Sequence, residues 1–193
     1  INIVCATWST NPKKGTSKIY TIADSNRDVN FVLCGRYPDA PDLPNLRIMG
    51  VLGREELARA MRSCDALYFP SENEACPNVV LEALASGLPV LYKDSGATPE
   101  LVGGCGMPVE VDSFRERLEG MMARHDELSR KARERAVALF SPQVVFPRYM
   151  EEIERSLDIP TSVPAWRRSL TAWNPRHILE LHGKRAARVV RGG

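Results

Sequence analysis

Short apolar runs recur along the first half of the chain, separated by polar or amphipathic segments. Runs of this length between turn signals predict strands, and apolar residues at successive rather than alternate positions predict strands buried on both faces. The runs read INIVCA, VNFVLCG, LRIMG, ALYFPS and PVLYK. The pattern predicts a parallel sheet with helices on both sides.

Helix start and stop signals lie between these runs. Thr16 follows Gly15 as an expected N-cap, Pro77 stands at a helix start, and Gly87 with Pro89 ends that helix. The predicted helices cover residues 16–23, 54–63, 78–86, 98–102, 113–139 and 143–157. Strands alternating with helices predict an α/β fold, a Rossmann-like doubly wound parallel sheet with a C-terminal helical extension.

Composition fits this class. Apolar residues make up 44% and charged residues 26% of the 193 residues, as in ordinary globular proteins. No apolar run approaches the roughly 20 residues of a membrane span, and no secretory leader is visible, so a cytoplasmic protein is expected. The five cysteines are expected to be reduced core thiols rather than disulfides or metal ligands.

The two ends of the chain carry further expectations. A core strand begins at Ile1 with no loop before it, so a partner domain is expected upstream. Residues 161–193 contain seven basic residues and one acid, about +6 against a net charge of +2 for the whole chain. Peripheral membrane association and a solvated end both remain open for this tail, and no nucleic-acid partner is expected.

In doubly wound sheets ligands bind beyond the carboxyl ends of the strands, so the loops there are the candidate site. The loop after the first strand lacks a G-x-G-x-x-G pattern, which disfavours a nicotinamide oxidoreductase. It ends instead in Lys13-Lys14-Gly15 just before a helix start. An ammonium beside a helix N-terminus favours a phosphate, although two solvated lysines would give the same pattern.

A pair of glutamates stands in the segment PSENEACPNVVLEALASGLPVL. Glu74 lies in the loop after a strand, and Glu82 lies on the next helix, in a polar stripe with Asn78 and Ser86. The rest of that helix is apolar, so we expect it to be buried and Glu82 to need a partner. The hydroxyl pair of a ribose or sugar would serve, and a structural arginine or simple exposure is the alternative.

The glutamate spacing and its surroundings resemble family 4 glycosyltransferases. Seven residues separate Glu74 from Glu82, as in the family's E-x7-E region, and SGLPV follows. The likeness extends to KKG, GVLGREELARAMRSCDALYFPS, SGATPELV and FSPQVVFPRYMEEIE. It covers residues 1–157, all within the C-terminal, nucleotide-sugar-binding domain of the GT-B fold, and leaves 158–193 as a basic extension.

The resemblance implies a retaining glycosyltransferase that moves a hexose-like unit from a nucleotide diphosphate sugar to an acceptor hydroxyl. The resemblance also implies that the acceptor domain lies outside this chain, which alone should turn over little or nothing. By the same resemblance Lys14 binds the diphosphate, Glu74 the transferred sugar, and Glu82 the ribose. Val51 and Leu52 would meet the base, with loop packing as an equal alternative.

Two departures from the family pattern bear on this reading. Trp8 stands where many relatives have an arginine, and Ala75, Cys76 and Pro77 replace glycines after the first glutamate. Proline has no N–H to offer a phosphate. Either Ser9, Thr10 or the amides of Asn78 and Val79 compensate, or the donor specificity of this chain has changed.

Two other functional classes stay open because of these departures. One is a non-catalytic sugar-nucleotide-binding module, and the other is a GT-B-type epimerase. The sequence has no Asp-x-Asp motif, so neither a metal nor another cofactor is expected beside the donor.

Overall fold

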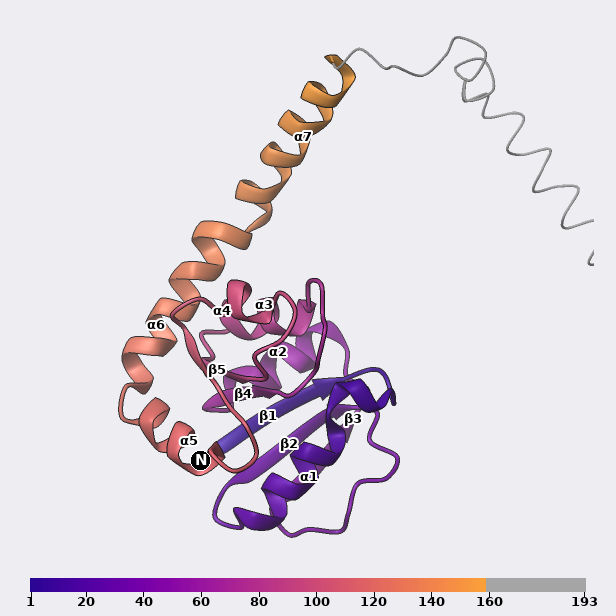
Figure 1. Ribbon diagram of the computed structural model, residues 1–193, viewed down its shortest axis with the longest axis vertical. Coiled ribbons are helices and arrows are strands. Elements are labelled where there is room, and N and C mark those ends of the chain that lie inside the picture. The colour runs from indigo at the N-terminus through magenta and orange to yellow at the C-terminus, as the bar shows by residue number, and fades with distance from the viewer. Residues whose placement is uncertain (159–193) are drawn as a thin grey trace, which may run out of the picture. The chain divides into compact units, whose positions relative to one another are not determined.

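The computed structural model describes residues 1–158 and contains a six-stranded sheet (Figure 1). Every neighbouring pair of strands is parallel, in the order β3-β2-β1-β4-β5-β6. The strands are β1 (Asn2–Thr7), β2 (Asn30–Gly35), β3 (Leu46–Gly50), β4 (Ala66–Phe69), β5 (Val90–Tyr92) and β6 (Gly106–Pro108). The order turns back between β1 and β4, which is where such sheets open a crevice for a ligand.

Helices cover both faces of this sheet. Buried residues of α1 and α5 pack with one apolar cluster, and those of α2, α3 and α4 pack with the other. The helices are α1 (Thr16–Ser25), α2 (Arg54–Arg62), α3 (Asn78–Ala85), α4 (Thr98–Val102), α5 (Phe114–Met122), α6 (His125–Arg135) and α7 (Pro142–Asp158), with a 3₁₀ turn η1 (Pro12–Lys14) and a π-helical stretch η2 (Ala136–Phe140). The doubly wound α/β fold is therefore confirmed.

The strand predictions hold with two differences. The short strand β6 was not predicted, because a glycine and a proline frame its single apolar residue, Met107. The prediction that every strand is buried on both faces is wrong for β3, where Ile48 is 51% and Met49 37% exposed. β3 lies at the edge of the sheet, where fewer elements cover it.

Two helix predictions also need correction. Gly15, with φ of 70°, is the N-cap of α1, and Thr16 is its first residue. The single helix predicted over 113–139 is divided at Ala123 and Arg124. The division lets α5 pack on the first apolar cluster while Ala132 of α6 reaches the second.

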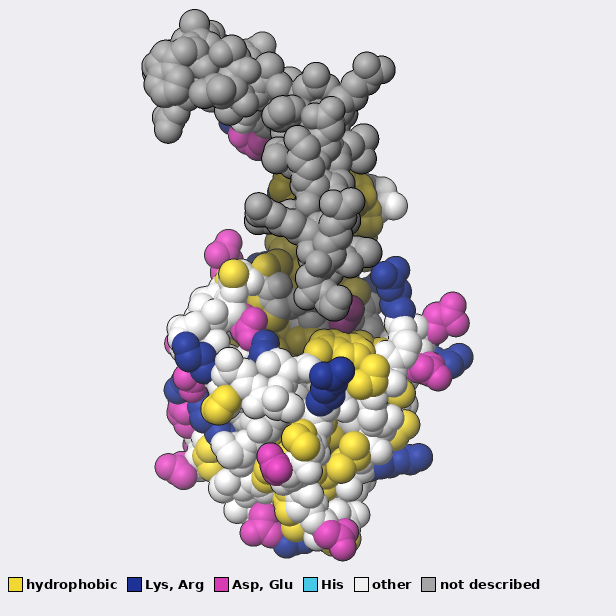
Figure 2. Space-filling model, turned by 90° about the vertical axis from the view of Figure 1, so that its right-hand side faces the viewer, with side chains coloured by type: hydrophobic (Ala, Val, Ile, Leu, Met, Phe, Trp, Pro, Cys, Tyr) yellow, Lys and Arg dark blue, Asp and Glu magenta, His cyan; other side chains and the backbone are white. Residues whose placement is uncertain are grey.

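All five cysteines are free thiols, and the prediction of core positions holds for four of them, which are buried; it is wrong for Cys76, which is exposed. Within the described residues, no helix is long and apolar enough to cross a membrane. Figure 2 shows Lys and Arg side chains interspersed with Asp and Glu on the face in view.

The chain divides into two compact units, residues 1–147 and 148–193. The second unit is described only as far as Asp158, as part of α7, whose residues 148–156 are all exposed. The predicted extension 158–193, including its basic tail, lies outside the described residues apart from Asp158.

Candidate functional site

A cavity of about 330 Å³ opens at the carboxyl ends of β1 and β4. This is the switch point of the sheet, where the strand order predicts a ligand site. Its lining comes from β1, β4, the loops that follow β1, β2 and β4, and the N-terminal parts of α1 and α3. The lining residues are Cys5, Ala6, Thr7, Trp8, Ser9, Lys14, Ile19, Tyr37, Tyr68, Phe69, Pro70, Ser71, Glu74, Cys76, Pro77, Asn78, Val79 and Glu82.

The β1–α1 loop and the β4–α3 loop form adjoining walls of the cavity. The Glu72 N–H donates to the Lys13 carbonyl at 2.9 Å, and Lys18 Nζ lies 2.6 Å from Glu72 Oε1. Gly15 sits so close that a Cβ there would lie 2.8 Å from the Pro70 carbonyl oxygen. A glycine is needed here both for this approach and for its positive φ. These contacts fix the two walls against each other.

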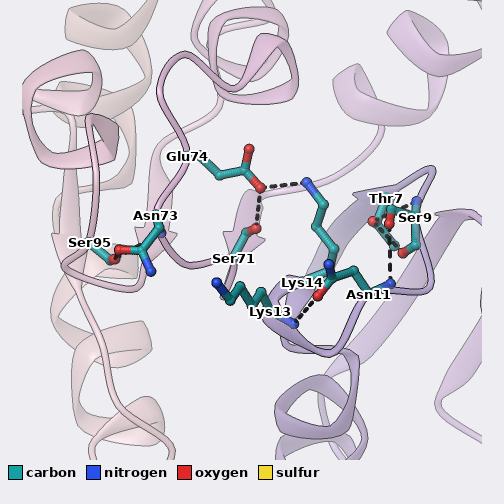
Figure 3. A network of polar contacts seen from close by, with 9 residues as sticks. All are labelled: Thr7, Ser9, Asn11, Lys13, Lys14, Ser71, Asn73, Glu74 and Ser95. Atoms are coloured by element: carbon teal, nitrogen blue, oxygen red, sulfur yellow. Dashed lines mark hydrogen bonds and ion pairs between the residues drawn. The ribbon is translucent and has the colours of Figure 1, made fainter.

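Lys14 and Glu74 meet across this junction (Figure 3). Lys14 Nζ lies 2.5 Å from Glu74 Oε1, and the Ser71 hydroxyl donates to the same oxygen at 2.6 Å. Partial burial raises the pKa of Glu74, but the hydrogen bonds from Lys14 and Ser71 and the Lys14 charge outweigh it, so the pKa is lowered overall. Glu74 is therefore an ionised carboxylate held in place by a cation and a hydroxyl.

The loop before α4 supports Glu74 from behind. The Ala97 N–H donates to the Glu74 carbonyl at 2.8 Å, and the Asn73 N–H donates to Ser95 Oγ at 3.0 Å. Gly96 has φ of 61°, and a Cβ there would lie 2.4 Å from the Glu74 carbonyl oxygen. The backbone position of Glu74 thus depends on a glycine more than twenty residues away in the sequence.

Glu82 has a different environment from the one predicted. Helix α3 buries only Val80, Ala83 and Leu84, so it is buried on one face and Glu82 lies on its exposed side. Within residues 1–158, Glu82 makes no hydrogen bond or ion pair. The expected burial of the whole helix is wrong, and of the two structural alternatives left open for Glu82, an arginine partner or exposure, the structure shows exposure. Partial burial raises its pKa, while the charge of Arg54 acts weakly in the opposite direction. Glu82 is one of the residues that line the cavity.

The first turn of α3 brings backbone donors to the cavity. Pro77 is the N-cap, and Asn78 and Val79 follow it in the lining. The first N–H groups of a helix have no partner within it and carry partial positive charge. Pro77 contributes no N–H, so the amides of Asn78 and Val79 are the ones available to an anion.

The remaining predicted residues divide between the cavity and its surroundings. Trp8, 54% exposed, and Ser9 line the cavity, whereas Thr10 does not. Val51 and Leu52 also lie outside the lining: Val51 is 60% exposed, and Leu52 packs against the second apolar cluster.

Sequence reasoning missed several lining residues, among them Tyr37, Tyr68, Ser71 and Cys76. All of them lie on or after strands whose carboxyl ends form the site, which is a sequence signal. Many polar and aromatic residues occupy such positions, so the signal does not identify these particular ones. Within the described residues, no cluster of three His, Cys, Asp or Glu side chains is placed to hold a metal ion. Metal independence remains a prediction.

Comparison with known proteins identifies the family. The profile described as "Glycosyl transferases group 1" matches residues 16–124, more than half of the chain. The chain belongs to this family. The resemblance drawn from the glutamate spacing is thereby confirmed.

Curated relatives include several mannosyltransferases. An MMP alpha-(1->4)-mannosyltransferase of Mycolicibacterium hassiacum is 33% identical over 168 residues, which cover 76% of this chain and 41% of the relative. A GDP-mannose-dependent alpha-mannosyltransferase of Mycolicibacterium smegmatis is 33% identical over 109 residues, 53% of this chain and 29% of the relative. The chain therefore spans less than half the length of these relatives.

Solved structures share the fold. A sucrose-phosphate synthase from Thermosynechococcus elongatus aligns with a TM-score of 0.69 and 20% identity, over 81% of this chain and 45% of that one. Anabaena HepE, solved in complex with UDP-glucose, aligns with a TM-score of 0.67 and 16% identity, over 79% of this chain and 48% of that one. At these identities the likeness establishes the Rossmann-like fold alone.

Proposed function

We propose that this chain is the donor-binding domain of a retaining glycosyltransferase that moves a sugar from a nucleotide diphosphate sugar to an acceptor hydroxyl. The observation that carries the proposal is the presence of Lys14, Glu74 and Glu82 around one cavity of a glycosyl transferases group 1 domain. GDP-mannose is the first donor to test, because relatives from three bacteria are named GDP-mannose-dependent. UDP-glucose, bound in the HepE structure, is the second.

Lys14 and Glu74 act together in this proposal. A donor diphosphate entering the cavity competes with Glu74 for the Lys14 ammonium. As Lys14 turns to the phosphate oxygens, Glu74 keeps its hydrogen bond from Ser71 and gains free lone pairs for hydroxyls of the transferred sugar. The same contact between Lys14 and Glu74 thus prepares both side chains before the donor arrives.

Bond breaking places negative charge on the departing nucleoside diphosphate. Lys14 and the amides of Asn78 and Val79 are oriented donors and can stabilise that charge as it develops. Glu82 lies further along α3 and accepts hydrogen bonds from the two ribose hydroxyls. In this mechanism neither a metal ion nor a cofactor takes part.

The acceptor hydroxyl requires protein beyond these residues. The curated relatives are more than twice as long as the segment they share with this chain. We infer that another domain of the longer protein binds the acceptor and closes the cleft over the donor. The chain alone therefore binds donor without transferring the sugar.

The first experiment is calorimetry of the 193-residue chain with GDP, UDP and ADP. One of the three should bind, and Glu82→Ala should weaken that binding while Glu116→Ala, on the exposed side of α5, should not. A folded chain that binds none of the three nucleotides would overturn the proposal.

The second experiment uses the full-length protein with radiolabelled GDP-mannose and UDP-glucose. Transfer or donor hydrolysis should be lost in Glu74→Ala and retained in Glu116→Ala. A wild-type protein that binds the donor but never consumes it would instead be a sugar-nucleotide-binding module. An isomerised free or nucleotide-linked sugar as product would identify an epimerase.

A further inference from the structure

Ser71 belongs to the candidate site although its side chain is buried. It follows the end of β4 by two residues, lines the cavity, and is only 1% exposed. Its hydroxyl donates to Glu74 Oε1 at 2.6 Å, and this is its one hydrogen bond within the described residues (Figure 3). The Ser71 hydroxyl therefore depends on the Glu74 carboxylate for its partner.

The backbone around Ser71 is held on both sides. Pro70, just before it, lies so close to Gly15 that a Cβ on that glycine would be 2.8 Å from the Pro70 carbonyl oxygen. Glu72, just after it, donates its N–H to the Lys13 carbonyl at 2.9 Å. Because both neighbours are in contact with the β1–α1 loop, Ser71 has little freedom to move. The place of its hydroxyl oxygen then depends on a single torsion angle.

The other partner of Glu74 Oε1 is less restricted. Lys14 Nζ lies 2.5 Å from the same oxygen, but its side chain is 28% exposed and has a flexible four-carbon stem. Its ammonium can exchange the carboxylate for water or for a phosphate. The buried Ser71 hydroxyl cannot make such an exchange without losing its partner, which is costly. A diphosphate that attracts Lys14 therefore leaves the contact between Ser71 and Glu74 in place.

The second carboxylate oxygen of Glu74 is open to a ligand. Ser71 and Lys14 both contact Oε1, whereas Oε2 has no hydrogen bond or ion pair within residues 1–158 (Figure 3). An ionised carboxylate oxygen accepts hydrogen bonds from hydroxyls and repels the negative charge of a phosphate. Since Glu74 lines the cavity, the sugar is the part of a nucleotide sugar that suits this oxygen.

We propose that Ser71 is a positioning residue, which fixes the Glu74 carboxylate for the hydroxyls of the transferred sugar. The proposal rests on the proposed function and deepens it, because it assigns the sugar and the diphosphate to different residues. Ser71 acts through Glu74 on the sugar, and Lys14 serves the diphosphate. Loss of the Ser71 hydroxyl should therefore weaken binding of a nucleotide sugar and leave binding of the bare nucleotide unchanged.

Ser71→Ala tests this assignment, because it removes the hydroxyl and adds no bulk. The 193-residue chain is titrated by calorimetry with GDP-mannose and GDP, UDP-glucose and UDP, and ADP-glucose and ADP. For the pair that the wild type binds, the variant should weaken the nucleotide sugar about fivefold relative to the nucleotide, the effect of about one net hydrogen bond. The affinity for the nucleotide itself should equal that of the wild type.

Ser113→Ala is the matched control. The Ser113 hydroxyl accepts from the Glu110 N–H at 3.2 Å and donates to the Glu110 carbonyl at 3.3 Å, outside the cavity lining. Its loss should change neither affinity. A second comparison adds Ser71→Ala to Glu74→Ala, where it should have no further effect on the ratio of the two affinities, because Ser71 acts through the missing carboxylate.

Equal weakening of nucleotide and nucleotide sugar in Ser71→Ala, or no weakening of either, would overturn the assignment while leaving the proposed function intact. An effect that persists in the Glu74→Ala background, or a Ser71→Ala chain that does not fold, would also overturn it, since the hydroxyl would then serve the fold. A folded wild-type chain that binds none of these ligands would overturn the proposed function, and this assignment with it.

Discussion

Glu74 and Glu82 face one cavity, but their surroundings shift their pKa values in opposite directions. Lys14 and Ser71 stabilise the ionised form of Glu74 and lower its pKa, whereas partial burial, with no partner among residues 1–158, raises the pKa of Glu82. One carboxylate is thus already satisfied in the unliganded domain, and the other is not. This difference leads to opposite stability changes when each charge is removed.

Glu74→Gln should destabilise the domain at pH 7 by roughly 0.5–1 kcal/mol, because the partly exposed ion pair with Lys14 is lost. The folded pKa of Glu74 lies below that of an unfolded glutamate, about 4.3. Its charge therefore stabilises the wild type fully above that value, and the contribution is lost as the pH falls through the folded pKa. Denaturant unfolding of both proteins between pH 7 and pH 3 should show the gap closing with acid. A gap that stays constant would contradict the assigned charge effect.

Glu82→Gln should leave stability at pH 7 unchanged or slightly increased. The pKa of Glu82 is higher in the folded state than in the unfolded state, so protonated Glu82 stabilises the fold at a pH below the unfolded pKa. That stabilisation is lost as the pH rises through the folded pKa. At neutral pH the side chain is ionised and no longer contributes it. The same substitution should weaken nucleotide binding about tenfold, because a charged acceptor for the ribose hydroxyls is lost. Thermal unfolding and calorimetry on one preparation measure both effects. Reduced stability with unchanged affinity would show that Glu82 serves the fold rather than the ligand.

At the scale of single residues, Lys14 and Glu74 could be identified because each lies in a loop that follows a strand, and Glu82 because it lies in a polar stripe of an apolar helix, seven residues after Glu74. The sequence did not reveal that Lys14 and Glu74 form an ion pair, because they are 60 residues apart. They meet only in the folded chain, where the β1–α1 and β4–α3 loops are hydrogen-bonded to each other. Sequence reasoning overestimated the burial of α3 because an apolar helix composition does not show which face the sheet covers. Ser71 was missed because only the folded loop shows its contact with Glu74.

At the scale of elements, the strands form a rigid frame, and the loops that follow them position the side chains of the candidate site. The β4–α3 loop carries Glu74, and the segment before α4 holds that loop through backbone contacts of Gly96 and Ala97. The contact is backbone to backbone, so side-chain rearrangement cannot relieve a change there. Gly96 is therefore a positioning residue for Glu74.

Gly96→Ala should destabilise the domain by about 1–3 kcal/mol and weaken donor binding, because it adds a Cβ against the Glu74 backbone and strains a positive φ. Gly87→Ala is the control for backbone strain. Its φ is 77°, but its Cβ would meet only ordinary contacts at 3.4 Å or more, and it lies outside the cavity lining. Chemical denaturation and nucleotide titration should show both losses in Gly96→Ala and the smaller, purely structural loss in Gly87→Ala. Equal donor affinity in the two variants would remove Gly96 from the support of the site.

The elements themselves were largely predictable because apolar runs and helix caps are local signals. The predicted strand at 46–50 and the predicted helix at 98–102 agree with β3 and α4. The break between α5 and α6 was not predictable, since residues 122–124 contain neither glycine nor proline. The turn there is imposed by the two apolar clusters that these helices fill, which is tertiary information.

At the scale of the whole molecule, the roles proposed for the cavity residues account for only one half of a transfer reaction. The proposed roles of Lys14, Glu74, Glu82 and the α3 amides all concern the donor. No predicted role in this chain concerns an acceptor, and the relatives extend well beyond the segment they share with it. We therefore expect the 193-residue chain to bind the donor and only the full-length protein to transfer the sugar. Neither activity should require a metal ion.

The full-length protein should transfer sugar equally well with excess chelator and with added magnesium or manganese, because Lys14 and the α3 amides supply the positive charge that a metal would otherwise provide. The 193-residue chain should bind the same nucleotide in either condition and transfer nothing.

Lys14→Ala distinguishes the charge of the ammonium from that of a metal ion. Without the ammonium, transfer should fall at least a hundredfold, the order expected for a preorganised charge-stabilising group. Added metal should not restore it. The control is Lys131→Ala, whose ammonium pairs with Glu127 on α6 and lies outside the cavity lining. Activity abolished by chelator in the wild type, or restored to Lys14→Ala by manganese, would assign the leaving-group charge to a metal ion instead.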